Sequence, residues 1–231
     1  PASPVHYQYD PVQTTKTSVH GAINMLGLAK RTNAKILQAS TSEVYGDPDQ
    51  HPQKEDYWGN VNPIGIRSCY DEGKRCAETL FFDYHRQHKL KIKVARIFNT
   101  YGPRQSCRAV IPTIITQIAG GENIIKLGST TPTRDFNFIL DTCSAFYEVG
   151  KSDACIGQVV NASSNYEISI GETVRVIADA MGARVEISSD AERVRPERSE
   201  VNRLFGDNSR IKSLTEWSPK YDGNDGFKRG I

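Results

Sequence analysis

Apolar residues recur at helical intervals in two long segments of the chain. Residues 10–31 carry Val19, Ile23 and Leu26 at positions i, i+4 and i+7, which predicts a helix with these side chains on one face. Residues 69–88 follow the same kind of pattern. The apolar face of this second segment consists of Ala77, Leu80, Phe81 and Tyr84. The sequence therefore predicts two long helices, each with one buried face.

Short apolar runs accompany these helices and predict strands. Residues 35–39 form one such run and residues 92–97 form another. Between them lies a polar stretch, residues 40–68, that is rich in Pro, Gly, Asp and Asn. The alternation of strand and helix indicates parallel βαβ units.

Beyond residue 110 the predicted elements are shorter. We expect a helix over 110–119, strands over 123–127 and 135–140, a helix opened by Asp141, a strand over 157–162 and a helix over 170–181. Ser169 and Glu172 form a capping-box pattern at the start of the last helix. Its predicted apolar face consists of Val174, Ile177, Ala178 and Met181.

These patterns together predict an α/β protein with a Rossmann-like, doubly wound parallel sheet and a smaller α+β lobe. We assign residues 1–109 to the sheet domain and residues 110–231 mainly to the smaller lobe, with the chain passing between the two more than once. The glycine-rich phosphate loop that opens a Rossmann fold is absent from the sequence. Gly223, Gly226 and Gly230 come nearest, but we expect no strand before them and no helix after them.

Composition limits the classes of function. The chain has 231 residues, with 29 basic and 27 acidic residues spread along it, so nothing indicates a nucleic-acid or membrane partner. No apolar run approaches the roughly 20 residues of a membrane span. Residues 1–7 do not resemble a signal peptide, and a cytoplasmic location is expected. The five cysteines form no C-x-x-C motif, which indicates free thiols, and no metal-ligand spacing is present.

Tyr70 and Lys74 are the first candidates for chemistry. They are four residues apart at the start of a predicted helix, so both side chains lie on one face. A lysine ammonium beside a phenol favours the phenolate and lowers its pKa from about 10. Such a tyrosine can take a proton from a sugar hydroxyl. The pair also arises by chance in many helices, so it is weak on its own.

Two further segments make the pattern more specific. Residues 40–46 (STSEVYG) directly follow a predicted strand, and the carboxyl end of a parallel strand is where open α/β sheets bind ligands. A hydroxyl and a carboxylate delivered there can bind a substrate and move a proton. Residues 96–104 (RIFNTYGPR) follow the next strand. These segments and the Tyr–Lys pair, in this order, are far more specific together than separately.

This series resembles the extended short-chain dehydrogenase/reductases that act on nucleotide sugars with NAD, and the resemblance covers nearly the whole chain. It implies that the catalytic residues are Thr41, Ser42, Glu43, Tyr70 and Lys74. In these roles Thr41 lies beside Tyr70, and Glu43 is an additional acid or base. The residues implied for NAD are Pro1, Ala2, Ser40, Tyr70, Lys74 and Arg104. The residues implied for the sugar nucleotide are Arg67, Asn99, Arg134 and Arg195.

The two halves of the chain resemble different branches of this family. Residues 1–104 resemble UDP-glucuronate decarboxylases through PASPVHY (1–7), DYWGNVNPIG (56–65) and RSCYDEGKR (67–75). Residues 105–231 resemble bacterial sugar-nucleotide 4,6-dehydratases through GSTTPTRDF (128–136) and ERVRPERSEVNRL (192–204). Arg67 stands where it could meet a substrate carboxylate, and an ordinary solvated arginine fits its position equally well.

Three functions remain open. The first is decarboxylation of UDP-glucuronate to UDP-xylose after oxidation at C4, and the second is 4,6-dehydration of a UDP-sugar with Glu43 as the acid or base. The third, motivated by the missing glycine-rich loop, is a truncated, inactive fragment that does not bind NAD. For the active enzymes the resemblance also implies a homodimer, in which the helices 10–31 and 69–88 pack against their copies.

Overall fold

The computed structural model describes residues 4–190 and 201–231 of the chain. Its first sheet has three parallel strands in the order β1-β2-β6. These strands are β1 (Ile36–Thr41), β2 (Ile92–Ile97) and β6 (Val159–Ala162). The register pairs Ile36 with Ile92 and Val94 with Val159. Because the pairing is parallel, the carboxyl ends of all three strands lie at one edge of the sheet.

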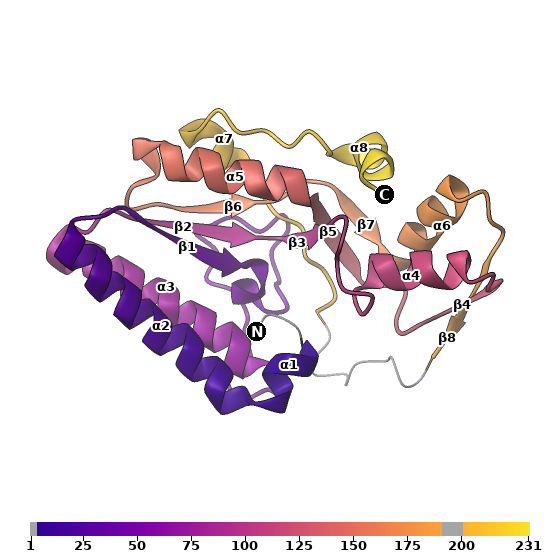
Figure 1. Cartoon of the computed structure of the whole chain (residues 1–231), viewed down its shortest axis with the longest axis horizontal. Coiled ribbons are helices and arrows are strands. Elements are labelled where there is room, and N and C mark those ends of the chain that lie inside the picture. Colours follow the sequence, from indigo (N-terminus) through magenta and orange to yellow (C-terminus); the bar gives the residue numbers. More distant parts are fainter. Residues whose placement is uncertain (1–3, 191–200) are drawn as a thin grey trace.

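Helices cover both faces of this sheet, as a doubly wound fold requires. On one face α2 (Pro11–Thr32) and α3 (Ser68–His88) lie side by side (Figure 1). On the other face lie α5 (Ile139–Lys151) and α7 (Ser209–Leu214). Buried side chains fill both interfaces, including Leu26, Phe81 and Val94 below the sheet and Val149, Val160 and Ile211 above it. The predicted Rossmann-like architecture is confirmed, and the predicted helix and strand bounds agree with it to within a few residues.

The buried face of α2 differs from the predicted one. The buried side chains of this helix are Thr14, Ala22, Leu26 and Ala29. Ile23 is 42% exposed, so the prediction is correct at Leu26 and wrong at Ile23. The reason is close approach between the two helices: a Cβ on Gly73 of α3 would lie only 3.2 Å from the Cβ of Ser18. Small residues allow this contact, and the larger Ile23 is turned outward.

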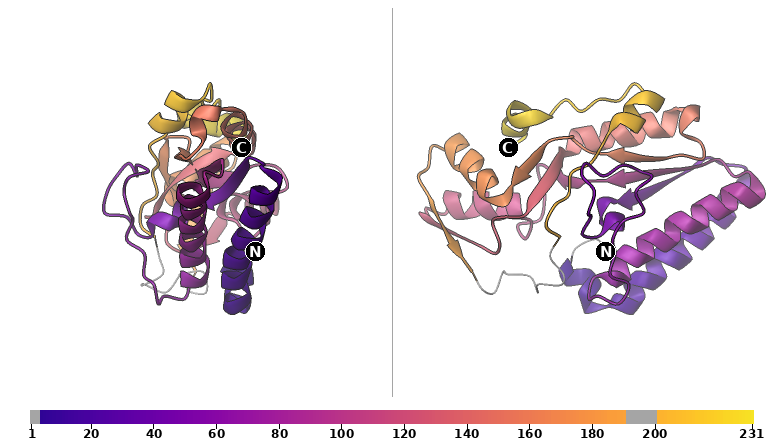
Figure 2. Two further views of the ribbon diagram at one scale, coloured as in Figure 1. Left: turned by 90° about the vertical axis from the view of Figure 1, so that its left-hand side faces the viewer. Right: turned by 180° about the vertical axis from the view of Figure 1, so that it is seen from behind.

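The second lobe is built around two small sheets, and Figure 2 shows the lobe from behind. In one, β5 (Thr133–Phe138) pairs in parallel with β3 (Asn99–Tyr101) and antiparallel with β7 (Glu167–Ser169). In the other, β4 (Ile124–Leu127) pairs in parallel with β8 (Glu186–Ser189). The helices of the lobe are α4 (Val110–Ala119), α6 (Ile170–Ala180) and α8 (Gly223–Gly230). Its apolar core includes Tyr101, Ile114, Ile125, Phe136, Ile177 and Phe227.

Two details of this lobe bear on the sequence-based predictions. The capping box at the start of α6 is present, because Ser169 and Glu172 each bond to the other's backbone N–H. Met181 is 38% exposed and follows the end of the helix, so its assignment to the apolar face was wrong. The three late glycines lie inside α8 itself. A Cβ on Gly226 would lie 2.3 Å from the backbone carbon of Tyr221, so packing requires a glycine at this position.

The chain passes between the two regions more than once. After β5 in the second lobe, α5 and β6 return to the first sheet. Residues 205–207 then bond to the loop before α3: Gln53 N–H donates to Phe205 O at 2.7 Å, and Asp207 N–H donates to Gln53 O at 2.9 Å. The short elements are α1 (Pro4–Tyr9), η1 (Ser42–Tyr45) and η2 (Asp153–Cys155). None of the helices in the described ranges is long and apolar enough to cross a membrane.

Candidate active site

The candidate catalytic residues meet at the carboxyl end of β1. The strand ends at Thr41, and η1 begins at the next residue, Ser42, whose side chain is buried. The Thr41 hydroxyl caps η1 by accepting a hydrogen bond from Glu43 N–H at 3.2 Å. This bond fixes the direction in which the chain leaves the strand. It therefore places Glu43 beside the first turn of α3, which carries Tyr70.

The structure brings Tyr70 and Lys74 together, although not in the way that their spacing suggested. Lys74 Nζ lies 5.8 Å from the centroid of the Tyr70 ring and donates a hydrogen bond to Ala39 O at 3.1 Å. Burial raises the pKa of Tyr70 to about 12, and a hydrogen bond with Thr41 opposes this rise. The expectation that Lys74 lowers the pKa of this phenol is therefore wrong for this structure, because the ammonium bonds to the strand. Burial also lowers the pKa of Lys74 itself.

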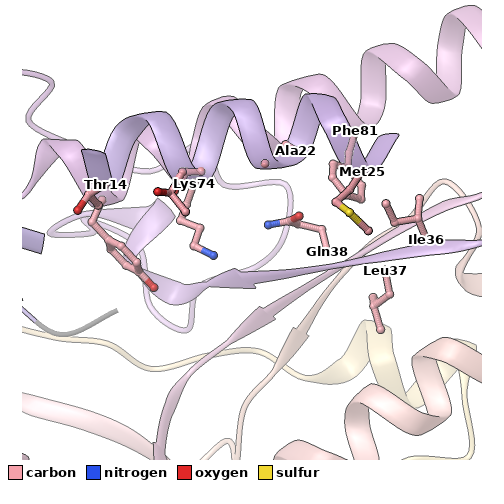
Figure 3. A pocket seen from close by; sticks show the side chains of 12 residues that line it. Thr14, Ala22, Met25, Ile36, Leu37, Gln38, Lys74 and Phe81 are labelled. Atoms are coloured by element: carbon pink, nitrogen blue, oxygen red, sulfur yellow. The ribbon is translucent and has the colours of Figure 1, made fainter. Parts of the chain in front are cut away.

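A cavity of about 430 Å³ adjoins this pair, between β1 and the helices α2 and α3. Tyr70 lines it, and the side chains of Lys74 and Gln38 point into it toward each other (Figure 3). Met25 and Phe81 lie together at the far end (Figure 3). The cavity thus has a polar end beside the candidate catalytic pair and an apolar end at Met25 and Phe81.

Glu43 is held by Arg67 in this structure. The two side chains form an ion pair and are only 18% and 12% exposed. Arg67 was expected to face a substrate, yet here it is engaged with the candidate acid or base. Asp71 lies in the same cluster, and burial raises the pKa of its carboxyl to about 7, with a further rise from Glu43 and an opposing effect of Arg67. The spacing of the sequence gave no sign of a second carboxylate here.

Tyr7 is also part of the site. Its ring stacks on that of Tyr70, with centroids 5.1 Å apart and planes inclined by 10°, and it is 1% exposed. Burial raises the pKa of Tyr7. This residue comes from α1, far from either motif, so no spacing rule connects it with Tyr70. The only signal was that it belongs to the segment 1–7, on which part of the family resemblance rests.

Ser40 belongs to a buried polar network behind the site. Its hydroxyl bonds to Glu78 Oε1 at 2.5 Å. Arg96 donates to both carboxylate oxygens of Glu78, at 3.1 and 2.7 Å, and to the Tyr45 hydroxyl at 2.9 Å. Tyr45 in turn donates to Asn161 Oδ1 at 2.8 Å. The network joins β1, α3, β2, η1 and β6, so it holds the elements that carry the candidate catalytic residues.

The remaining candidate residues differ in their surroundings. Asn99 Oδ1 is buried and has no hydrogen-bond partner among the described residues, which is unusual unless a ligand meets it. Arg134 is 8% exposed and donates to Thr133 O at 2.7 Å, whereas Arg104 is exposed. Pro1, Ala2 and Arg195 lie outside the described residues. Within ranges 4–190 and 201–231 no group of three or more side chains could hold a metal ion.

Comparison with known proteins identifies the family. Residues 2–229 match the family described as GDP-mannose 4,6 dehydratase, and the chain belongs to this family. UDP-glucuronic acid decarboxylase 6 of Arabidopsis thaliana is 45% identical over 229 residues, which cover 98% of this chain and 65% of that protein. UDP-glucuronic acid decarboxylase 1 of Xenopus tropicalis is 42% identical over 233 residues, covering 100% of this chain and 54% of that protein. The chain thus spans 54–65% of the length of these two relatives.

The similarity to decarboxylases continues through the second half of the chain, where sequence segments alone suggested a dehydratase branch. Dehydratases do occur among similar solved structures. dTDP-glucose 4,6-dehydratase from Bacillus anthracis, in complex with NAD, has a TM-score of 0.79 and 26% identity, covering 94% of this chain and 67% of that one. RMD from Pseudomonas aeruginosa, complexed with NADPH, has a TM-score of 0.85 and 26% identity, covering 100% and 76%.

Proposed function

We propose that the chain carries the reacting centre of an NAD-dependent enzyme that oxidises a nucleotide sugar at C4. The proposed substrate is UDP-glucuronate, which loses carbon dioxide and becomes UDP-xylose. The observation that carries the proposal is the meeting of Thr41, Glu43, Tyr70 and Lys74 at the carboxyl end of β1. The identity of 42–45% to UDP-glucuronic acid decarboxylases, over 98–100% of the chain, supports this substrate above other nucleotide sugars.

The proposed role of Tyr70 is to take the proton of the C4 hydroxyl, with Thr41 hydrogen-bonded at the same point. A phenol with a pKa of about 12 stays protonated at neutral pH, so catalysis requires a cation that lowers this pKa. Lys74 supplies it if its ammonium turns from Ala39 O toward the phenol. NAD, when bound, would supply the acceptor for the C4 hydride and the source from which this hydride is returned. The 4-ketone is β to the carboxylate, so carbon dioxide leaves, and Glu43 is placed to assist protonation of the resulting enolate.

The described residues suit one end of NAD. The cavity beside Tyr70 offers the ammonium of the half-buried Lys74 and an amide on Gln38, which are donors for ribose hydroxyls or a carboxamide. The residues that we propose to hold the cofactor are Pro1, Ala2, Ser40, Tyr70, Lys74 and Arg104. No residue is assigned to the pyrophosphate, because the sequence has no glycine-rich phosphate loop.

We assign NAD mainly to residues 1–109 and the sugar nucleotide mainly to residues 110–231. The residues proposed for the substrate are Arg67, Asn99, Arg134 and Arg195. The buried, unpartnered oxygen of Asn99 supports its place in this set. The low exposure of Arg134 supports its place as well, since an arginine on a strand at this position would otherwise be expected at the surface.

A second candidate, 4,6-dehydration of a UDP-sugar, begins with the same oxidation at C4. It differs in using Glu43 as the acid or base for loss of water across C5 and C6. The position of Glu43 beside Tyr70 and the similarity to the structure of a dTDP-glucose 4,6-dehydratase favour keeping it as an alternative. The two functions lead to different products, so one assay separates them.

The test is to incubate the intact natural protein with NAD and either UDP-glucuronate or UDP-N-acetylglucosamine, and to follow the products by mass. Loss of carbon dioxide from the first sugar supports the decarboxylase, and loss of water from the second overturns it. No product from either, with no NAD retained, identifies an inactive protein. We expect Tyr70→Phe to lower turnover by about 10²–10⁴-fold. Tyr84→Phe, on the same helix, is the control and keeps full activity.

We propose a homodimer in which α2 and α3 pack against their copies. α2 supports this, because Val12, Ile23 and Leu28 are 63%, 42% and 44% exposed. Exposed apolar side chains on a long helix suit burial against a second helix pair. Leu28→Lys should shift the sedimentation coefficient from that of a dimer to that of a monomer. A wild-type protein that sediments as a monomer at micromolar concentration would exclude this arrangement.

A further inference from the structure

Glu78 is a buried carboxylate on α3, one helical turn after the candidate catalytic Lys74. It is 7% exposed, and it accepts three hydrogen bonds. The Ser40 hydroxyl donates to Oε1 at 2.5 Å, and Arg96 donates from Nε to Oε1 at 3.1 Å and from Nη2 to Oε2 at 2.7 Å. Both oxygens thus have partners, as burial of a carboxylate requires. Ser40 of β1 and Arg96 of β2 are register partners, so Glu78 joins α3 to two adjacent strands at one level.

Glu78 and Lys74 attach one face of α3 to consecutive residues of β1. Side chains four residues apart on a helix share a face. Lys74 donates to Ala39 O, and Glu78 accepts from the hydroxyl of the next residue, Ser40. The residue after Ser40 is Thr41, which ends the strand. The two side chains therefore set the level at which α3 meets the end of β1.

The charge of Glu78 also acts on Lys74. Burial lowers the pKa of Lys74, and the negative charge of Glu78 opposes this fall. Lys74 must keep its proton if it is to favour the phenolate of Tyr70, because a neutral amine offers no charge. Arg96 carries a positive charge and bonds to both oxygens of Glu78, so it weakens this support. Lys74 therefore lies at the end of a row of alternating charges.

The groups packed around this row come from several elements. The side chains of α2 and β1 that line the cavity shared with Lys74 are all uncharged. The titratable and charged groups that the described residues place around the row are Tyr7 of α1, Glu43 and Tyr45 of η1, Tyr70, Asp71 and Glu78 of α3, and Arg96 of β2. Of these groups, Glu78 is the one whose charge raises the pKa of Lys74.

We propose that Glu78 is a positioning residue, whose carboxylate anchors α3 on the end of β1 and keeps the Lys74 ammonium charged. The proposal rests on the proposed function in one respect, that a charged Lys74 assists Tyr70. The rival explanation is that Glu78 and Arg96 form a buried ion pair that serves the fold alone. Such a pair is broken from either side with the same result. The charge on Lys74, in contrast, responds with opposite sign to loss of the anion and to loss of the cation.

A direct test needs no turnover and measures the proton on Lys74. The intact natural protein, without added NAD, is labelled with trace acetic anhydride between about pH 6 and pH 11, and the acetylation of each lysine is read by mass spectrometry. An amine reacts only when it has lost its proton, so the midpoint of the pH dependence is the pKa of that lysine. The exposed Lys126 is the internal reference. Midpoints are compared and not rates, because accessibility changes the rate alone.

We expect Glu78→Gln to lower the Lys74 midpoint by about one pH unit, because it removes the anion and leaves the guanidinium of Arg96. Arg96→Gln should raise the midpoint, because the charge of Glu78 is then uncompensated. Glu78→Asp keeps the charge and should leave the midpoint near the wild-type value, although it loosens the hydrogen bonds. Glu72→Gln is the matched control. It is the same substitution on the same helix, at a partly exposed acid paired with Arg75, and it should not move the midpoint.

Turnover should follow the same signs. The rate falls at high pH when Lys74 loses its proton. In Glu78→Gln this alkaline limb should therefore move down by about one pH unit, a loss of about tenfold on that side. In Arg96→Gln the limb should move up. A purely structural role would lower the rate at every pH and leave the limb in place.

The outcomes separate the two proposals. Lys74 midpoints that move in the same direction in Glu78→Gln and Arg96→Gln, or that do not move, overturn the role of Glu78 and leave the decarboxylase proposal standing. If circular dichroism shows that Glu78→Gln does not fold, a midpoint that fails to rise in Arg96→Gln, or that falls in Glu78→Asp, overturns the role equally. Opposite shifts in a protein that releases no carbon dioxide support the role of Glu78 toward Lys74 and overturn the decarboxylase.

Discussion

Asp71 and Asp135 are both buried aspartates, and they lie in different regions of the molecule. Burial raises the pKa of each carboxyl to about 7. Asp135, on β5 of the second lobe, accepts four hydrogen bonds: from Ser164 N–H at 2.8 Å and its hydroxyl at 2.6 Å, from Asn165 N–H at 3.1 Å and from Gly206 N–H at 3.2 Å. Asp71, at the candidate active site, leaves one oxygen without any among the described residues.

The difference separates a carboxylate that maintains the fold from one that is available for function. The donors to Asp135 come from two segments of chain, 164–165 and 206, which it fixes to β5. No ligand is needed to explain its burial. The Oδ1 atom of Asp71 accepts no hydrogen bond from the described residues, so it fixes none of their segments in place. A raised pKa therefore does not by itself identify a functional carboxylate. The two aspartates differ in the number of hydrogen bonds that each carboxylate accepts, and this number separates them.

The largest effect on stability should come from Asp135→Asn. The asparagine amide offers one acceptor oxygen, whereas the donors now share the two carboxylate oxygens of Asp135. Its NH₂ group would also face backbone N–H groups. We expect the free energy of unfolding to fall by about 2–3 kcal/mol, the cost of leaving buried donors unsatisfied. Urea denaturation followed by circular dichroism measures it. Asp83→Asn, in an exposed pair with Arg86, should change stability by less than about 0.5 kcal/mol, and equal losses in both variants would remove the distinction.

Asp71→Asn should have a smaller effect and one that depends on pH. A raised pKa in the folded state means that the stability contributed by Asp71 is present below its ordinary pKa of about 4 and is lost as pH rises toward 7. At pH 5 we expect the free energy of unfolding of the variant to lie within about 1 kcal/mol of the wild-type value. At pH 8 we expect it to be higher relative to wild type than at pH 5. Denaturation curves at both values measure this. A variant that becomes less stable relative to wild type as pH rises would show that the ionised Asp71 is well paired.

Much of the fold could be predicted from periodicity. The segments 10–31 and 69–88 are long enough for the helical pattern to be unambiguous, and the runs 35–39 and 92–97 are short and apolar. The error at Ile23 arose because hydrophobicity alone ranks a large side chain as buried, whereas two helices that approach closely select small ones. That choice depends on the partner helix, which no single-helix pattern contains.

The candidate site could be predicted in part. Tyr70, Lys74 and Thr41 lie on adjacent elements in a recognisable order, and the structure brings them together. The stacking of Tyr7 and the pairing of Glu43 with Arg67 depend on how separate elements fold against one another, so local spacing could not show them. The pKa of Tyr70 was predicted in the wrong direction, because burial outweighs a cation that bonds elsewhere.

The repeated passage of the chain between its two regions has a consequence for how the molecule forms. Val94 pairs with Val159, and Gln53 bonds to Phe205 and Asp207, more than 150 residues later. Contacts so distant in sequence form slowly, because a large loop must close before they contribute. The loop before α3 cannot reach its final position until residues 205–207 have left the ribosome. The candidate active site is therefore completed only after residues 205–207 are in place, although its own residues 41–74 are made earlier.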